Sequence, residues 1–173
     1  MEAVGDGYGS SSGAVSVGGS VTATSADATG TGAPLGETVS GNTAGGGYRL
    51  VNDDDISVNA TIIASGVSLI ASGAGSDIAV NEDVTATNNA VLIAGGNIVT
   101  DGDGNGTATV TAVELGLSAG GSIGTPGQSL LTDTDNIAMN AVGDAYVSNT
   151  GAVNVVGSVT ATSADATGTG APL

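Results

Sequence analysis

The chain has no cysteine, histidine, tryptophan or phenylalanine, and Arg49 is the single Lys or Arg side chain among its 173 residues. The absence of cysteine excludes a disulfide framework and a thiolate metal site. The absence of histidine excludes imidazole catalysis and most zinc, copper and iron centres. The remaining polar chemistry rests on carboxylates, amides and hydroxyls, so no firm cofactor is predicted.

Positive charge is almost missing, whereas negative charge is abundant. Seventeen Asp and Glu residues against one Lys or Arg give a formal net charge of −16 at pH 7. Nucleic acids and anionic membrane surfaces are bound through clusters of Lys and Arg, so both are excluded as partners. The longest strongly apolar run, AVLIAGG at residues 90–96, has the length of a strand and is too short to span a bilayer. We therefore expect no membrane insertion.

Aromatic residues make up only 2% of the chain and all of them are tyrosines, whereas hydrophobic residues make up 40%. The 31 glycines raise the alternative of a disordered chain. Against disorder stand the many Val and Ile residues, because disordered chains are poor in such side chains. Aliphatic side chains without large aromatics fill a narrow interior better than a wide one. The composition thus favours a folded chain with a thin, repeated core.

One long segment of the sequence occurs twice. GSVTATSADATGTGAPL stands at residues 19–35 and again, without a change, at residues 157–173, so the numbering of the two copies differs by 138. The same offset aligns residues 1–18 with residues 139–156, where 11 of 18 positions match. Across both stretches, 28 of 35 aligned positions are identical.

This repetition predicts a tandem array. Met1 aligns with the internal Met139, so its match is not explained by a role as initiator. We interpret residues 1–138 as one full unit and residues 139–173 as the start of the next, within a longer repetitive protein. The expected partners are neighbouring repeats of the same long chain, or other copies that join it end to end.

A shorter period lies inside the unit. LIAGGNIVT (92–100) and LSAGGSIGT (117–125) share an AGGxI core at an offset of 25 in the numbering, and SLIASGAGSDIAV (68–80) resembles them, with Ala71 preceding Ala94 by 23. Short runs of alternating apolar residues occupy residues 56–60, 77–81, 83–87, 107–113, 136–142, 144–149 and 152–163. Alternation places apolar side chains on one face of a strand, and the Gly, Asn and Asp residues between the runs suit turns.

Short strands with a period of about 20–25 residues predict an all-β parallel β-helix, or β-solenoid. At about 23 residues per coil, one such unit holds about six coils and advances about 29 Å. A β-sandwich is the rival architecture, but it would normally use aromatic core anchors. The glycine-rich stretch at about residues 28–48 shows little alternation, and we predict that it is an irregular loop that leaves the solenoid.

Two phrases of the sequence resemble a known family. VLIAGGNIVTDGDGNGTATVTAVELGLSAGG (91–121) and LSAGGSIGTPGQSLLTDTDNIAMNAVGDAYVSNTGAVNV (117–155) look like repeats of bacterial surface proteins of the filamentous-haemagglutinin type, and the likeness covers about residues 56–163. The resemblance implies a right-handed parallel β-helix, export to the bacterial cell surface, and a role in adhesion, cell–cell contact or fibre formation. The secretion domain of that family is not among these residues, which leaves the export route open.

The segment TDGDGNG (100–106) places Asp101, Asp103 and Asn105 at alternate positions, the spacing of the first ligands in a calcium loop. The acid that closes such a loop is missing, because its twelfth position is Ala112. We favour a polar turn between coils as the interpretation of this segment, with a calcium site as the alternative.

Carboxylates elsewhere form the run Asp53 to Asp55 and the pair Asp133 and Asp135. Paired carboxylates can catalyse glycoside hydrolysis, but nothing in the sequence selects a pair, and basic or aromatic groups that hold a sugar are nearly absent. We expect a solvated acidic rim and no enzymatic activity. The expected function is that of an extracellular, structural and adhesive segment of a β-solenoid fibre. A carbohydrate- or calcium-binding β-helix module, with cell-surface glycans as partners, and a self-polymerising filament protomer are the alternatives.

Overall fold

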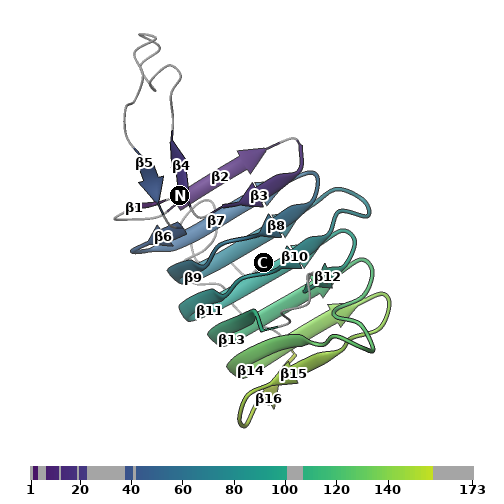
Figure 1. The fold of residues 1–173 in the computed structure, drawn as a ribbon. Helices are drawn as coiled ribbons and strands as arrows, with labels where there is room; N and C mark the ends of the chain where they lie inside the picture. Colours follow the sequence, from purple (N-terminus) through teal and green to yellow (C-terminus); the bar gives the residue numbers. More distant parts are fainter. Residues whose placement is uncertain are drawn as a thin grey trace.

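The computed structural model describes residues 2–3, 7–11, 13–18, 20–22, 38–40, 42–100 and 107–157. Within these ranges the chain is all-β and contains no helix. The strands stack as a β-solenoid of about five turns, with parallel pairing between successive coils (Figure 1). The predicted all-β parallel solenoid is therefore confirmed, and its handedness stays a prediction.

The larger sheet has ten strands and contains the long strand of each coil. Its central members are β9 (Ile62–Ala71), β11 (Val84–Ala94), β13 (Thr109–Ala119) and β14 (Leu130–Ala141). Towards the ends of the stack, pairs of short strands take the place of one long strand. These are β1 (Glu2–Ala3), β2 (Gly7–Ser11), β6 (Asn42–Ala44), β7 (Gly47–Asn52), β15 (Val147–Asn149) and β16 (Asn154–Val155).

A second parallel sheet contains the short strand of each coil. Its members are β3 (Val15–Val17), β8 (Ile56–Val58), β10 (Ile78–Val80) and β12 (Ile98–Val99). Two isolated bridges continue it, from Ile98 to Ile123 and from Ile123 to Ala145. A third, antiparallel pair joins β4 (Ser20–Thr22) to β5 (Thr38–Ser40) beside the N-terminal coils (Figure 1).

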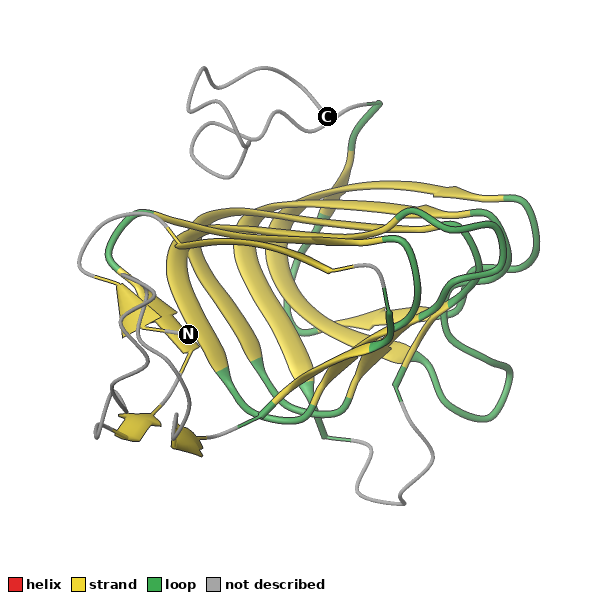
Figure 2. Cartoon of the chain, turned by 90° about the horizontal axis from the view of Figure 1, so that it is seen from above, coloured by secondary structure: helices red, strands yellow, loops and turns green. Residues whose placement is uncertain are grey.

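Viewed from above, the coils enclose a closed and flattened interior (Figure 2). The long strands curve around one edge, and loops form the opposite edge. Along the short-strand column, Ile56 is followed by its register partners Ile78, Ile98, Ile123 and Ala145, at intervals of 22, 20, 25 and 22 in the numbering. The predicted coil length of about 20–25 residues is confirmed over this part of the stack.

The core consists of columns of like side chains. Leu50, Leu69, Leu92 and Leu117 occupy the same register on successive coils and are all buried. A fully buried Leu contributes about 1.5–3 kcal/mol, so each coil is stabilised mainly by the neighbours that cover its apolar face. Among the residues whose burial the structure describes, Tyr48 is the one buried aromatic side chain, and the rest of this core is aliphatic.

Close backbone contact explains why the AGG motif recurs. Ala71, Ala94 and Ala119 pair in register, which is the alignment that the sequence offsets of 23 and 25 predict. Directly after these alanines, a Cβ added to Gly95 would overlap the backbone oxygen of Gly73, and one added to Gly120 would overlap that of Gly95. The chain is packed so tightly at Gly95 and Gly120 that these two positions need a residue without a side chain.

The stretch predicted as an irregular loop, residues 28–48, is only partly described. Residues 42–44 form β6, and residues 47–48 begin β7, both within the larger sheet. Residues 38–40 form β5. The register partners Val15 and Ile56 are 41 apart in the numbering, against 20 to 25 for the coils that follow. Residues 42–44 and 47–48 belong to strands of the larger sheet, so the predicted loop does not extend over them.

Candidate functional site: the corner ladder and the outer faces

A ladder of polar side chains runs along one corner of the solenoid, immediately before the short strands. The Oδ1 atom of Asp55 accepts the backbone N–H of Asp77 at 2.8 Å, and the Oδ1 atom of Asp77 accepts that of Asn97 at 2.5 Å. The Oδ1 atom of Asn97 accepts the N–H of Ser122 at 2.9 Å, and the Oγ atom of Ser122 accepts that of Asp144 at 3.1 Å. We call these five residues the corner ladder.

The corner ladder fixes the register of the coils. Each of its bonds joins positions 20 to 25 residues apart, so the bond forms only when successive coils lie in the correct alignment. The residue after each ladder position is an Ile buried in the core, except that Ala145 follows Asp144. The sequence does carry this signal, as a polar residue before an aliphatic one at each of the five ladder positions, but a polar residue at that place is equally typical of an ordinary turn.

A second set of side-chain bonds joins coils at the other end of the short strands. The Nδ2 atom of Asn81 donates to the Oδ1 atom of Asn59 at 2.7 Å, and the Nδ2 atom of Asn59 donates to the Oγ atom of Ser16 at 2.6 Å. Asparagine can donate and accept at once, so it can continue a chain of bonds from coil to coil. Side chains as well as the backbone therefore join successive coils at both ends of these short strands.

The calcium candidates Asp101, Asp103 and Asn105 lie outside the described residues. Among the residues that are described, no group of three or more His, Cys, Asp or Glu side chains is placed to hold a metal ion. Of the other acidic groups singled out above, Asp133 and Asp135 are exposed on β14, while the intervening Thr134 is buried. Asp53 and Asp54 are exposed in the turn after β7.

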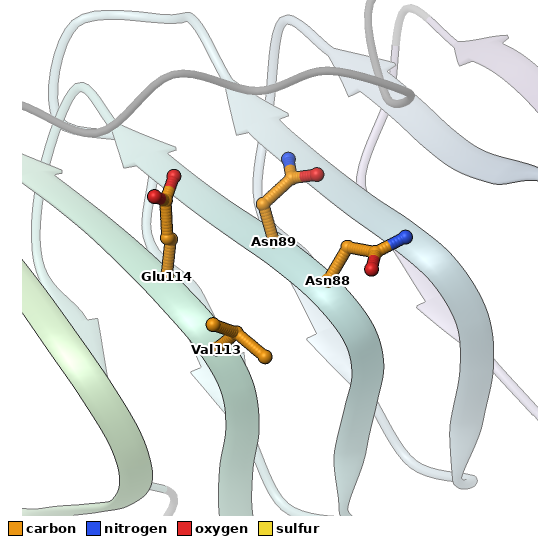
Figure 3. A pocket seen from close by; sticks show the side chains of 4 residues that line it. All are labelled: Asn88, Asn89, Val113 and Glu114. Atoms are coloured by element: carbon orange, nitrogen blue, oxygen red, sulfur yellow. The ribbon is translucent and has the colours of Figure 1, made fainter.

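The larger sheet carries a surface depression of about 340 Å³, lined by Asn88, Asn89, Val113 and Glu114 (Figure 3). It lies at a β-bulge, because between Ala86 and Asn89 strand β11 carries one residue more than its neighbours β9 and β13. Asn89 and Glu114 are register partners and project to the same side of the sheet (Figure 3). The depression offers a carboxylate and amides, which can bond to hydroxyl groups of a ligand.

The described residues form a β-solenoid in which polar side chains join one coil to the next. No protein-family model matches it, and neither a curated protein nor a solved structure matches it. No helix within the described ranges is long and apolar enough to cross a membrane.

Proposed function

We propose that the chain is a structural segment of a secreted bacterial repeat protein, in which it forms part of a β-solenoid surface fibre or adhesin stalk. The observation that carries this proposal is the corner ladder, which repeats one bond from coil to coil between Asp55 and Asp144. A ladder of this kind does not build one local binding or catalytic site. It holds successive coils in the same alignment, as a rod requires.

The net charge is consistent with a rod that is surrounded by other copies of itself. A net charge of −16 with one Arg makes rods repel each other side by side, which opposes lateral aggregation. Among the described residues, the outer strands β2 and β16 each pair on one side only, and such edges favour pairing with another coil. The expected contacts are therefore end to end, with neighbouring repeats of the same chain or with other copies, and cell-surface glycans are the expected targets of attachment.

Electron microscopy of a lengthened chain tests the rod. Because residues 157–173 repeat residues 19–35, joining residues 36–173 after Leu173 continues the sequence as it runs within the unit. We expect particles of constant cross-section whose length increases by about 29 Å for each added unit. Particles that stay equidimensional as units are added would refute the rod.

Localisation needs a separate experiment on the source cells. Antibodies raised against the chain, detected by immunogold labelling, are expected to decorate fibres on the outer surface. Label confined to the cell interior would contradict the extracellular role while leaving the rod architecture in place.

A glycan-binding module is the second candidate function, and the depression at Asn88, Asn89 and Glu114 favours it. A glycan array probed with the chain, and then with N88A and E114Q, tests it. A glycan signal that both variants lose would support binding at this depression. The exposed Asp133 on the neighbouring part of the sheet provides the matched control, D133N, which should leave such a signal unchanged.

A further inference from the structure

The short-strand column and the long sequence repeat together give the number of coils in a unit. The column runs through Ile56, Ile78, Ile98, Ile123 and Ala145, and so contains four coils between its first and last positions. The two copies of the repeated sequence differ by 138 in the numbering. In a chain that carries a following unit, the counterpart of Ile56 therefore stands at position 194.

The chain from Ala145 to position 194 has the length of two coils of about 24 residues, which is within the range of the coils already described. Four described coils and two further ones complete the repeat, so a unit would hold six coils of about 23 residues on average. With Ala145 in the short-strand column, the chain can therefore continue through the second unit with coils of 20 to 25 residues, as in the described part of the stack.

The N-terminal copy of the repeated sequence takes a different register. Val15 lies in the short-strand column and pairs with Ile56. Its counterpart one unit later is Val153, which directly precedes β16, and β16 pairs with β14 in the larger sheet. If Val153 stood in the short-strand column instead, a unit would hold five coils, and two of them would be longer than every coil described between Ile56 and Ala145.

The corner ladder distinguishes the two registers independently of coil length. At the C-terminal end the ladder residue is Asp144, whose backbone N–H donates to the Oγ atom of Ser122. The carboxylate of Asp144 can accept a backbone N–H from a following coil. At the N-terminal end the residue before Val15 is Ala14, which has no side-chain acceptor. The N–H of Asp55 is donated within its own turn, to the Oδ1 atom of Asp54 at 2.9 Å. The ladder therefore continues in the C-terminal register and is interrupted in the N-terminal one.

We infer that the C-terminal end of the solenoid, formed by β15 and β16 at the start of the second unit, is the docking surface for the remaining coils of that unit, in the six-coil register set by Ala145. This inference rests on the proposed role as part of a repetitive rod. Val142 and Val155 are 83% and 75% exposed at this end, and a following coil covers such side chains. In the lengthened chain, the pairing of β3 with β8 is then expected for the N-terminal copy alone, and the later copies of that sequence pair differently.

Engineered disulfides test the register, because the chain has no cysteine of its own. In-register partners on neighbouring coils lie about 4.8 Å apart, within the range that a disulfide spans. The test uses the lengthened chain described above. Ser16 and Ser57 are partners in the N-terminal register, and Asn154 is the counterpart of Ser16 one unit later. Asn136 and Asn154 are partners in the C-terminal register.

Three pairs are oxidised under the same mild conditions and scored by mass spectrometry. S16C with S57C, and N136C with N154C, are expected to close. N154C with the second unit's counterpart of S57C is expected to stay open. Closure of this last pair would overturn the inference, and so would failure of N136C with N154C to close.

The control pair S57C with A79C joins register partners inside the stack and reports the solenoid itself. If this pair closes and the rods lengthen, but N154C pairs with the counterpart of S57C, the register is wrong and the proposed rod stands. If the control pair stays open, the rod itself fails. The length added per unit gives a second measure, about 29 Å for six coils against about 24 Å for five.

Discussion

Asp77 and Asn97 are joined by two bonds across successive coils. The Oδ1 atom of Asp77 accepts the backbone N–H of Asn97 at 2.5 Å and its side-chain Nδ2 at 3.1 Å. The backbone of Asp77 is paired in the same way, since its N–H is donated to Asp55 and its C=O accepts from Ile56 at 2.9 Å. Both backbone groups of Asp77 are therefore hydrogen-bonded, although the residue lies outside the strands.

The first prediction concerns removal of one member of the corner ladder. D77A deletes the acceptor of two donors, and leaving a partly buried donor without a partner costs about 1–3 kcal/mol. D77N keeps an oxygen in place, so we expect it to lose less than half as much. Urea unfolding followed by circular dichroism measures both. E82A, at an exposed position between β10 and β11, is the control and should stay within about 0.5 kcal/mol of the parent. Equal losses of unfolding free energy in D77A and E82A would show that the corner ladder does not stabilise the fold.

The second prediction concerns the glycine corner. G95A places a methyl group against the backbone oxygen of Gly73, which cannot move without shifting the coil below. Overpacking of this kind costs typically about 1–3 kcal/mol, and we expect the upper part of that range. G127A is the matched control, because nothing lies near its added methyl group and its backbone is not in the left-handed region. A G95A chain that melts at the same temperature as G127A would contradict the packing described for this corner.

The third prediction compares the centre of the leucine column with its end. L92A removes a fully buried side chain between two covering coils, and such changes cost about 2–5 kcal/mol. Met139 occupies the same register two coils further on and is 40% exposed. M139A should therefore cost clearly less than L92A in the same unfolding assay. A larger loss for M139A would mean that the C-terminal coil is covered in solution.

The strands and their alignment were predictable because the coils repeat their own chemistry. Alternation marks residues 77–81 and 83–87 as strand segments, and β10 and the start of β11 lie there. The offsets that align Ala71, Ala94 and Ala119 in the sequence are the offsets of their pairing in the stack. In a stacked fold, similar residues one period apart in the sequence become neighbours on successive coils. The short period of the sequence therefore predicted which residues pair.

Three features were not predictable in this way, because they depend on neighbours rather than on local pattern. Strand β6 and the start of β7 lie in glycine-rich sequence with little alternation, and their strand form follows from pairing with β9. Asp55 and Asn97 look like ordinary turn residues until the coils are stacked. The depression beside Glu114 arises from one extra residue in β11, which only the comparison of registers reveals.

The fourth prediction concerns alkaline pH. Burial raises the pKa of Tyr48 above its ordinary value of 10.0, because the charged phenolate is poorly solvated in the core. The neutral form is thus favoured by folding, so this contribution to stability is complete below pH 10 and is lost as the pH rises through the raised pKa. Unfolding free energies measured from pH 8 to 11 should fall above pH 10. Y48F should reduce that fall, whereas Y146F, at a half-buried position, should retain it. An unchanged fall in Y48F would assign the alkaline loss to other groups.

The last prediction concerns the acidic charge and calcium. Asp55 and Asp77 are consecutive ladder residues, and like charges about 5 Å apart repel by roughly 1 kcal/mol in water. Sodium chloride screens this repulsion, so we expect the unfolding midpoint to rise with ionic strength. Because residues 100–106 are interpreted as a polar turn, calcium chloride at equal ionic strength should add nothing further. A ligand that binds only the folded chain adds stability as its concentration exceeds its Kd. An excess effect of calcium that D101N/D103N abolishes would therefore establish the alternative, a calcium site at Asp101, Asp103 and Asn105. An excess that survives in D101N/D103N would instead place the ion elsewhere on the acidic surface.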